Sequence, residues 1–166
     1  MNRLHPVVVG GAIVGVVDVI AAFAVHAAFG GVRPATVLQG IASGLLGPAA
    51  FQGGDATAAL GMVLHFVIAF VVAAVYYLAS RGWPVLVRRP LVYGMIYGVL
   101  VYAVMNQVVL PMSRVTLRPR PWSFIVTMIV VHLLCVGLPV ALTMARADRD
   151  ALRRASRSDL NELLTP

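Results

Sequence analysis

The sequence is poor in charged residues and has no lysine at all. Only 11% of its 166 residues are charged, whereas a soluble domain carries about 25%. With 60% hydrophobic residues, the chain cannot build a surface that faces water on all sides. These shortages exclude an ordinary soluble domain and indicate a protein that lies in the lipid bilayer.

Other absences limit the chemistry that the chain can perform. A single cysteine, Cys135, cannot form a disulfide within the chain. The sequence has no P-loop, no G-x-S-x-G, no H-E-x-x-H and no C-x-x-C motif, so no catalytic residue is indicated by a motif. The 13 basic residues are all arginines and lie mainly beside apolar runs, so the net charge of +7 indicates phospholipid head groups as partners rather than nucleic acid.

Four apolar runs are each long enough to cross a bilayer, which takes roughly 20 residues. Helices are the expected form, because lipid leaves unpaired backbone groups unsatisfied and the runs are too long for barrel strands. We therefore predict an all-α integral membrane protein, with residues 1–145 forming a bundle of four transmembrane helices. The predicted spans cover residues 7–29, 56–79, 91–111 and 122–145.

The positions of the arginines predict the orientation of the chain. Nine lie on the side that holds both termini and four on the other side, so the positive-inside rule places both termini in the cytoplasm. Residues 146–166 then form a basic cytoplasmic tail. The last outer loop carries Arg114, Arg118 and Arg120, which can contact lipid head groups or another anion. A solvated loop stiffened by prolines is the plainer interpretation of the same residues.

The first outer loop contains the sequence ATVLQGIASGLLGPAAFQGGD, which is too short and too rich in glycine to span a membrane. Leu38, Ile41 and Leu45 share one helical face, and three glycines form another. We predict a short helix here. It either lies in the membrane interface or enters the bilayer as a re-entrant segment.

Asp18 stands in the middle of the first apolar run, within VGVVDVIAAF. A charged carboxylate at the centre of a span costs roughly 2.5–3.5 kcal/mol on the insertion scale, so Asp18 must face protein or water or be protonated. Gly11, Gly15 and Ala22 share its helix face, and small residues allow another helix to approach closely. We therefore expect Asp18 to point into the bundle.

Each of the other runs also carries a polar group beside small residues, namely His65, Asn106 and His132. Counted from the outer ends of the spans, both histidines fall in one layer with Asp18 near the membrane centre, and Asn106 lies above it. We predict a polar intramembrane cluster of these four residues, in which His65 and His132 are the partners of Asp18.

Three functions fit such a cluster. If the spans pack in order around a square, His65 and His132 can ligate a b-type haem, with Gly61 making room for the macrocycle. Alternatively, the two histidines and Asp18 form a divalent-metal or proton site in a transporter-like protein. In the third interpretation, which we favour from the sequence, the polar groups only hold the helices together. The chain is then a structural or accessory bundle without a catalytic domain of its own.

The segment LQGIASGLLGPAAFQGGDATAALGMVLHFVIAFVVAAVYYLASR resembles a group of small, uncharacterised bacterial inner-membrane proteins with four spans. The resemblance implies a multi-pass protein of the bacterial cytoplasmic membrane, and it brings no activity and no catalytic residues. Glycine-rich helix faces favour tight packing within the chain or between copies. The expected partners are therefore membrane lipids, a second copy of the chain or a larger membrane complex.

Overall fold

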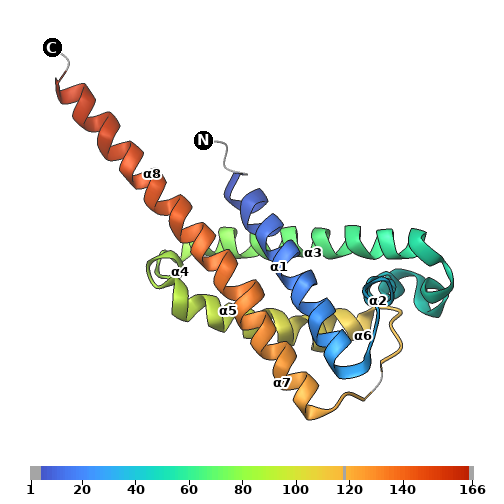
Figure 1. Cartoon of the computed structure of the whole chain (residues 1–166). Helices are drawn as coiled ribbons and strands as arrows, with labels where there is room; N and C mark the ends of the chain where they lie inside the picture. Colours follow the sequence, from blue (N-terminus) through green and yellow to red (C-terminus); the bar gives the residue numbers. More distant parts are fainter. Residues whose placement is uncertain (1–4, 118, 165–166) are drawn as a thin grey trace.

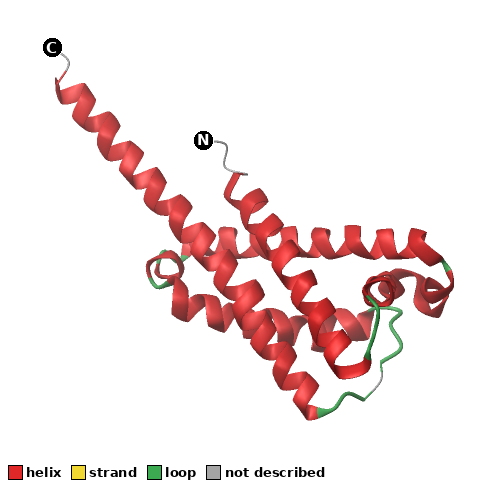
Figure 2. Ribbon diagram, in the orientation of Figure 1, coloured by secondary structure: helices red, strands yellow, loops and turns green. Residues whose placement is uncertain are grey.

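The structure, a computed structural model, describes residues 5–117 and 119–164. Within these ranges every regular element is helical and there is no β-strand (Figure 2). The prediction of an all-helical chain with four helices long and apolar enough to cross a membrane is confirmed. These four helices are His5–Gly30, Gly54–Gly82, Pro90–Met112 and Trp122–Ser158.

The first half of the chain forms two long helices joined by a shorter helical segment. The long helices are α1 (His5–Gly30) and α3 (Gly54–Gly82), and α2 (Pro34–Leu46) and the 3₁₀ helix η1 (Gly47–Gln52) lie between them. Proline at the first position of α2 has the backbone angle that a helix start needs. Gly47, at φ +66°, ends α2 in a conformation that other residues rarely adopt. The short helix predicted in this loop is therefore present.

The second half forms two further long helices, and each contains a π-helical segment. The third span consists of α5 (Pro90–Val104), the π segment η2 (Met105–Val109) and α6 (Leu110–Met112). The fourth consists of α7 (Trp122–Val131), the π segment η3 (His132–Gly137) and α8 (Leu138–Leu164). Segments of this kind are rare and are frequently found at functional sites.

Two prolines explain where the π segments form. Pro111 and Pro139 each lie two residues beyond the end of a π segment. A proline has no N–H to donate, and its ring clashes with the carbonyl of the residue four positions earlier. Those carbonyls belong to Gln107 and Cys135, which lie inside η2 and η3 respectively. The wider π turn relieves the clash while the helix continues.

The four long helices pack as a chain of neighbours rather than as an evenly closed square. α1 contacts α3 on one side and the α7–η3–α8 helix on the other, and that helix in turn contacts α5 (Figure 1). The contact between α5 and the fourth helix is very close, because a Cβ atom at Gly98 would lie 2.5 Å from the carbonyl oxygen of His132. Gly94 and Gly137 meet backbone to backbone in the same interface.

The packed core lies at the end of the bundle that holds the short helix α4 (Val85–Arg88), which we call the α4 end. There Tyr97 on α5 donates a hydrogen bond of 2.8 Å to the carbonyl of Val72 on α3, and its ring meets the ring of Tyr76 edge to face. Tyr76 is buried and donates to the carbonyl of Leu86. These contacts join α3 to α5 at the α4 end. Towards the opposite end, which we call the α2 end, a pocket separates the two helices.

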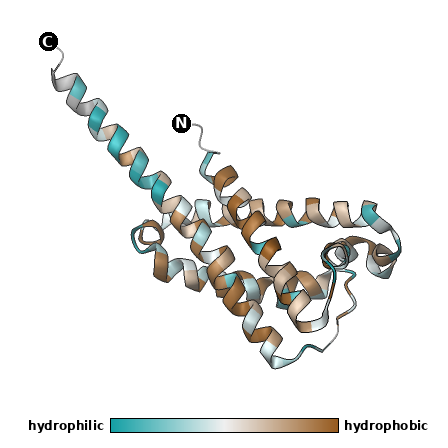
Figure 3. Ribbon diagram, viewed as in Figure 1, coloured by the Kyte–Doolittle hydropathy of each residue, from teal (hydrophilic) through white to brown (hydrophobic). Residues whose placement is uncertain are grey.

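The fourth helix continues beyond the predicted end of its span at residue 145. It remains helical to Leu164, so the boundary between bundle and tail is a change in polarity and not a break in the helix (Figure 3). Residues 148–158 are exposed, and Figure 3 shows mostly hydrophilic residues along this part of α8. Alanine, arginine and leucine are strong helix formers, which accounts for the continuation.

A candidate binding pocket between the helices

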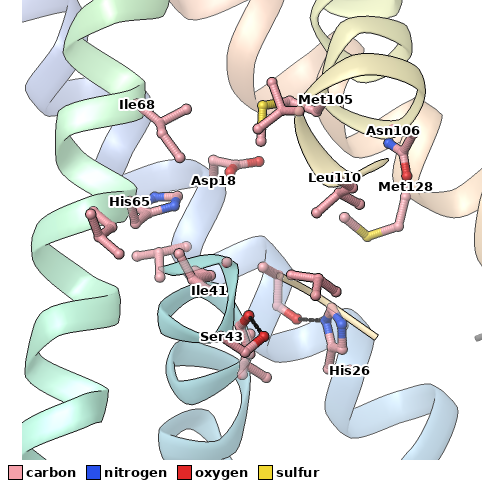
Figure 4. A pocket seen from close by; sticks show the side chains of 18 of the residues that line it. Asp18, His26, Ile41, Ser43, His65, Ile68, Met105, Asn106, Leu110 and Met128 are labelled. Atoms are coloured by element: carbon pink, nitrogen blue, oxygen red, sulfur yellow. Dashed lines mark hydrogen bonds between the residues drawn. The ribbon is translucent and has the colours of Figure 1, made fainter. Parts of the chain in front are cut away.

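A pocket of about 1060 Å³ lies in the α2 end of the bundle. Residues of all four long helices line it, together with α2 and the loop that precedes α7. Most of the lining side chains are apolar, and Ile68, Met105, Leu110 and Met128 are among those shown in Figure 4. The volume reaches the upper end of the range of about 300–1000 Å³ that is typical of sites for small organic molecules.

The four residues of the predicted polar cluster all line this pocket. They come from different helices: Asp18 from α1, His65 from α3, Asn106 from η2 and His132 from η3. Two of the four therefore belong to the π segments. The structure thus brings the four residues to one cavity, and the contacts that each one makes show how they are arranged within it.

The Asp18 carboxylate has no hydrogen-bond partner among the described residues. Its Oδ1 atom is buried, and no donor lies within bonding distance of it. In Figure 4 the carboxylate points into the pocket from α1, between His65 and Met105. A buried polar group normally has a partner, so an unpaired carboxylate oxygen beside a cavity is a notable exception. The expected pairing of Asp18 with His65 and His132 is not present.

His65 instead binds the backbone of α1. Its Nε2 atom donates a hydrogen bond of 2.9 Å to the carbonyl oxygen of Gly15. Because a carbonyl can only accept, Nε2 carries a proton. Gly15 allows this approach, since a side chain there would collide with the Phe66 ring. His65 therefore links α3 to α1.

His132 and Asn106 bind the backbone of their own helices. His132 donates through Nδ1 to the carbonyl of Met128 at 2.8 Å, and its ring packs edge to face against Tyr102. Asn106 donates through Nδ2 to the carbonyl of Tyr102 at 2.9 Å and keeps its side-chain oxygen as an acceptor. Neither residue forms a hydrogen bond with Asp18 in the part of the chain that the structure describes.

His26 is a pocket residue that the sequence analysis did not include in the cluster. It lies on α1 and donates through Nδ1 to the carbonyl of Ala22 at 2.8 Å (Figure 4). Its ring packs edge to face against Phe124. A signal for it was present, because it continues the stripe of Gly11, Gly15, Asp18 and Ala22 by one further helical turn.

The arginines of the last outer loop have different positions. Arg120 lines the pocket near its α2 end, and its guanidinium lies 5.2 Å from the centre of the Phe124 ring. Arg114 is exposed, and its backbone N–H donates a 3.0 Å hydrogen bond to the carbonyl of Gly44, which fixes the loop to α2. Arg118 lies outside the described residues.

The structure gives one observation on the metal hypothesis and another on the haem hypothesis. Among residues 5–117 and 119–164, no three His, Cys, Asp or Glu side chains lie close enough together to hold a metal ion. Gly61 does not make room for a macrocycle. It packs against the backbone of α2, where an added Cβ would overlap the carbonyl oxygen of Leu38. That part of the haem argument is wrong, because the space beside Gly61 is filled by α2.

The pocket thus combines apolar walls with a few polar groups, among them the unpaired carboxylate of Asp18. Such a site suits a molecule with a large apolar part and a small polar part. Comparison with protein-family models, with curated protein sequences and with solved structures finds no match to this chain. The function must therefore be argued from the pocket itself.

Proposed function

We propose that this chain is a multi-pass accessory protein of the bacterial cytoplasmic membrane that binds an amphiphilic molecule in the pocket between its helices. The observation that carries the proposal is the pocket itself, with about 1060 Å³ of largely apolar space. The chain has no motif for catalysis, so binding is the activity that the geometry supports. The proposal refines the accessory bundle that we favour from the sequence, because it gives the bundle a ligand.

The position of the pocket favours a ligand that enters from the bilayer. Its lining residues on α1 and α3 include Asp18 and His65, which stand near the middle of helices long enough to cross a membrane. A water-soluble solute would gain little from walls made of isoleucine, leucine and methionine. An amphiphile gains about 25 cal/mol for each Å² of apolar surface that it buries.

The environment of α2 supports a re-entrant segment rather than a helix that only lies on the surface. Leu38 on α2 packs in one cluster with Val19, which lies 11 residues before Gly30 at the end of α1, or about 16 Å along the helix axis. Leu46 on α2 exposes an apolar side chain outside the pocket, and Leu45 and η1 residue Phe51 are exposed where they line it. Both observations are expected of a segment that has protein on one face and lipid on the other.

The orientation follows from the arginines. Both termini then lie in the cytoplasm, the α4 end faces the cytoplasm, and α2 and Arg120 lie towards the outer side. In this orientation the pocket is nearer the outer leaflet. Arg120 lies at its outer end, at the depth of the lipid head groups.

The proposal is tested by native mass spectrometry of the protein released from membranes in a mild non-ionic detergent. We expect a bound amphiphile on the wild type and its loss in Ala22→Phe, which fills the pocket from α1. The matched control is Ala24→Phe, because Ala24 is exposed on the same helix and does not line the pocket. Equal amounts of bound amphiphile in both variants would contradict the proposal.

An absorption spectrum tests the haem hypothesis on the same preparation. We expect no Soret band that shifts on reduction, because the ligand that we propose is an amphiphile without a chromophore. A Soret band that is lost in His132→Ala would identify haem as the occupant of the pocket and overturn the proposed ligand class.

A further inference from the structure

Several polar groups of the pocket donate to main-chain carbonyls, and the unpaired carboxylate of Asp18 identifies the chemistry of the ligand. The rings of His26 and His132 use their Nδ1–H groups on main-chain carbonyls, and His65 uses its Nε2–H in the same way. Ser43 likewise donates to the carbonyl of Gly40, and Asn106 to that of Tyr102. None of these hydrogen bonds reaches Asp18, and Asn106 keeps one Nδ2–H and its side-chain oxygen.

Asp18 adds an acceptor that carries charge when ionised. Its Oδ1 atom is buried and has no partner among the described residues. An ionised carboxylate in a region of low dielectric is stable only beside a donor or a cation. Among the described residues, Arg120 is the only arginine that lines the pocket. It forms no ion pair with Asp18 and lies instead over the Phe124 ring. An ionised Asp18 therefore takes its partner from outside the described chain.

We infer that the ligand carries an ammonium group, so that the pocket binds a lipophilic amine with its nitrogen at Asp18. This inference rests on the proposed binding function and adds the class of the ligand. A primary ammonium supplies a positive charge and three donors, which complements a buried carboxylate oxygen without a partner. Its alkyl part lies against the apolar wall that includes Ile68, Met105 and Met128. Asp18 is the residue that determines specificity for the cation.

The inference is tested with three probes that share one alkyl chain and differ in the head group: dodecylammonium, dodecanol and dodecyl sulfate. Dissociation constants are measured for the purified full-length protein in a non-ionic detergent. We expect wild type to bind dodecylammonium at least tenfold more tightly than dodecanol. Asp18→Asn keeps the shape of the side chain and removes the charge, so it abolishes that preference while binding of dodecanol is unchanged.

Asp55→Asn is the matched control, because Asp55 lies in the first turn of α3 and does not line the pocket. We expect this variant to bind all three probes as wild type does. Binding of dodecanol by Asp18→Asn also shows that the variant is folded.

Three outcomes separate the inference from the proposed function. Equal binding of dodecylammonium by wild type and Asp18→Asn overturns the inference, and so does tightest binding of dodecyl sulfate, which would make Arg120 the recognition residue. In both cases an amphiphile still binds, so the proposed function stands. If none of the probes binds, the proposed function itself fails.

The same ammonium group occurs in free amines and in aminophospholipids. A second experiment distinguishes these two sources of the ligand. The protein is reconstituted in vesicles of phosphatidylcholine with and without phosphatidylethanolamine and then extracted. Recovery of phosphatidylethanolamine at about one molecule per protein, displaced by dodecylammonium, identifies the lipid as the source. Binding of dodecylammonium without any retained phosphatidylethanolamine identifies a free amine.

Discussion

The Nε2 atom of His65 lies 2.9 Å from the carbonyl oxygen of Gly15, and this hydrogen bond is a side-chain link between α3 and α1. It has two consequences for the pocket. It fixes the His65 ring beside Asp18, one turn along α1 from Gly15, and it places a proton on Nε2. The ring that was expected to pair with Asp18 therefore supports the packing of the helices and leaves the carboxylate free.

Replacement of His65 by phenylalanine tests this link. The variant keeps a ring of similar size and loses the donor, so we expect the free energy of unfolding to fall by about 1 kcal/mol, within the range measured for hydrogen bonds between membrane helices. Unfolding is followed by titration with SDS in mixed micelles. His132→Phe is the control, because it loses a bond to a carbonyl of its own helix, and its loss is expected to be smaller. Equal losses in the two variants would show that the contact with Gly15 does not stabilise the bundle.

The close approach of α5 to the fourth helix predicts a strong effect at Gly98. A Cβ atom there would meet the backbone at His132 and Leu133, which cannot move as a flexible side chain does. We expect Gly98→Ala to lower the free energy of unfolding by about 1–3 kcal/mol, the usual cost of overpacking. Gly40→Ala is the control, because an added Cβ at Gly40 meets no atom within 4 Å. In α2 that change is expected to be neutral or stabilising by up to about 1 kcal/mol. Similar effects at both sites would contradict the observed helix contact.

The proposed orientation predicts which positions react with a membrane-impermeant maleimide on intact cells. In a Cys135→Ala background, Leu117→Cys lies in the loop between α6 and α7 and should be labelled from outside. Leu152→Cys, on the exposed part of α8, should be labelled only after the membrane is opened. Both side chains are more than half exposed, so a difference between them reports the side of the membrane and not burial. The opposite pattern would place the termini outside.

The sequence was sufficient to predict the four helices because each is a long apolar run, and this property does not depend on tertiary contacts. It also placed Asp18, His65, Asn106 and His132 near one another, and all four line one pocket. Small residues on one helix face indicate that another helix packs closely against it. A polar residue on the same face is therefore expected to lie inside the bundle.

The hydrogen-bond partners could not be predicted in the same way. His65, His132 and Asn106 all bind main-chain carbonyls, and a sequence pattern carries no information on which carbonyl lies nearby. The π segments were also missed, although Pro111 and Pro139 are signals for them. A proline within an apolar run can produce a kink, a break or a π turn, and the choice depends on the contacts of the neighbouring helix.

The separation of α3 from α5 at the α2 end was not predicted either. If the helices stood around a square, every neighbouring pair would be in contact along its length. In the structure, Tyr76 and Tyr97 hold the two helices together at the α4 end, and α2 packs against α3 through Gly61 at the other end. The pocket results from this arrangement, which depends on contacts between residues far apart in the sequence.

Photolabelling with a dodecylamine that carries a diazirine in its alkyl chain tests the central claim most directly, because it shows where an amphiphile rests on the protein. We predict labels on pocket residues such as Ile68, Met105 and Met128, and loss of those labels in the presence of excess unlabelled dodecylammonium. Labels confined to exposed positions on α3 such as Val63, Val67 and Val71, unaffected by the competitor, would contradict the account. That result would show that the amphiphile only coats the outer surface of the helices.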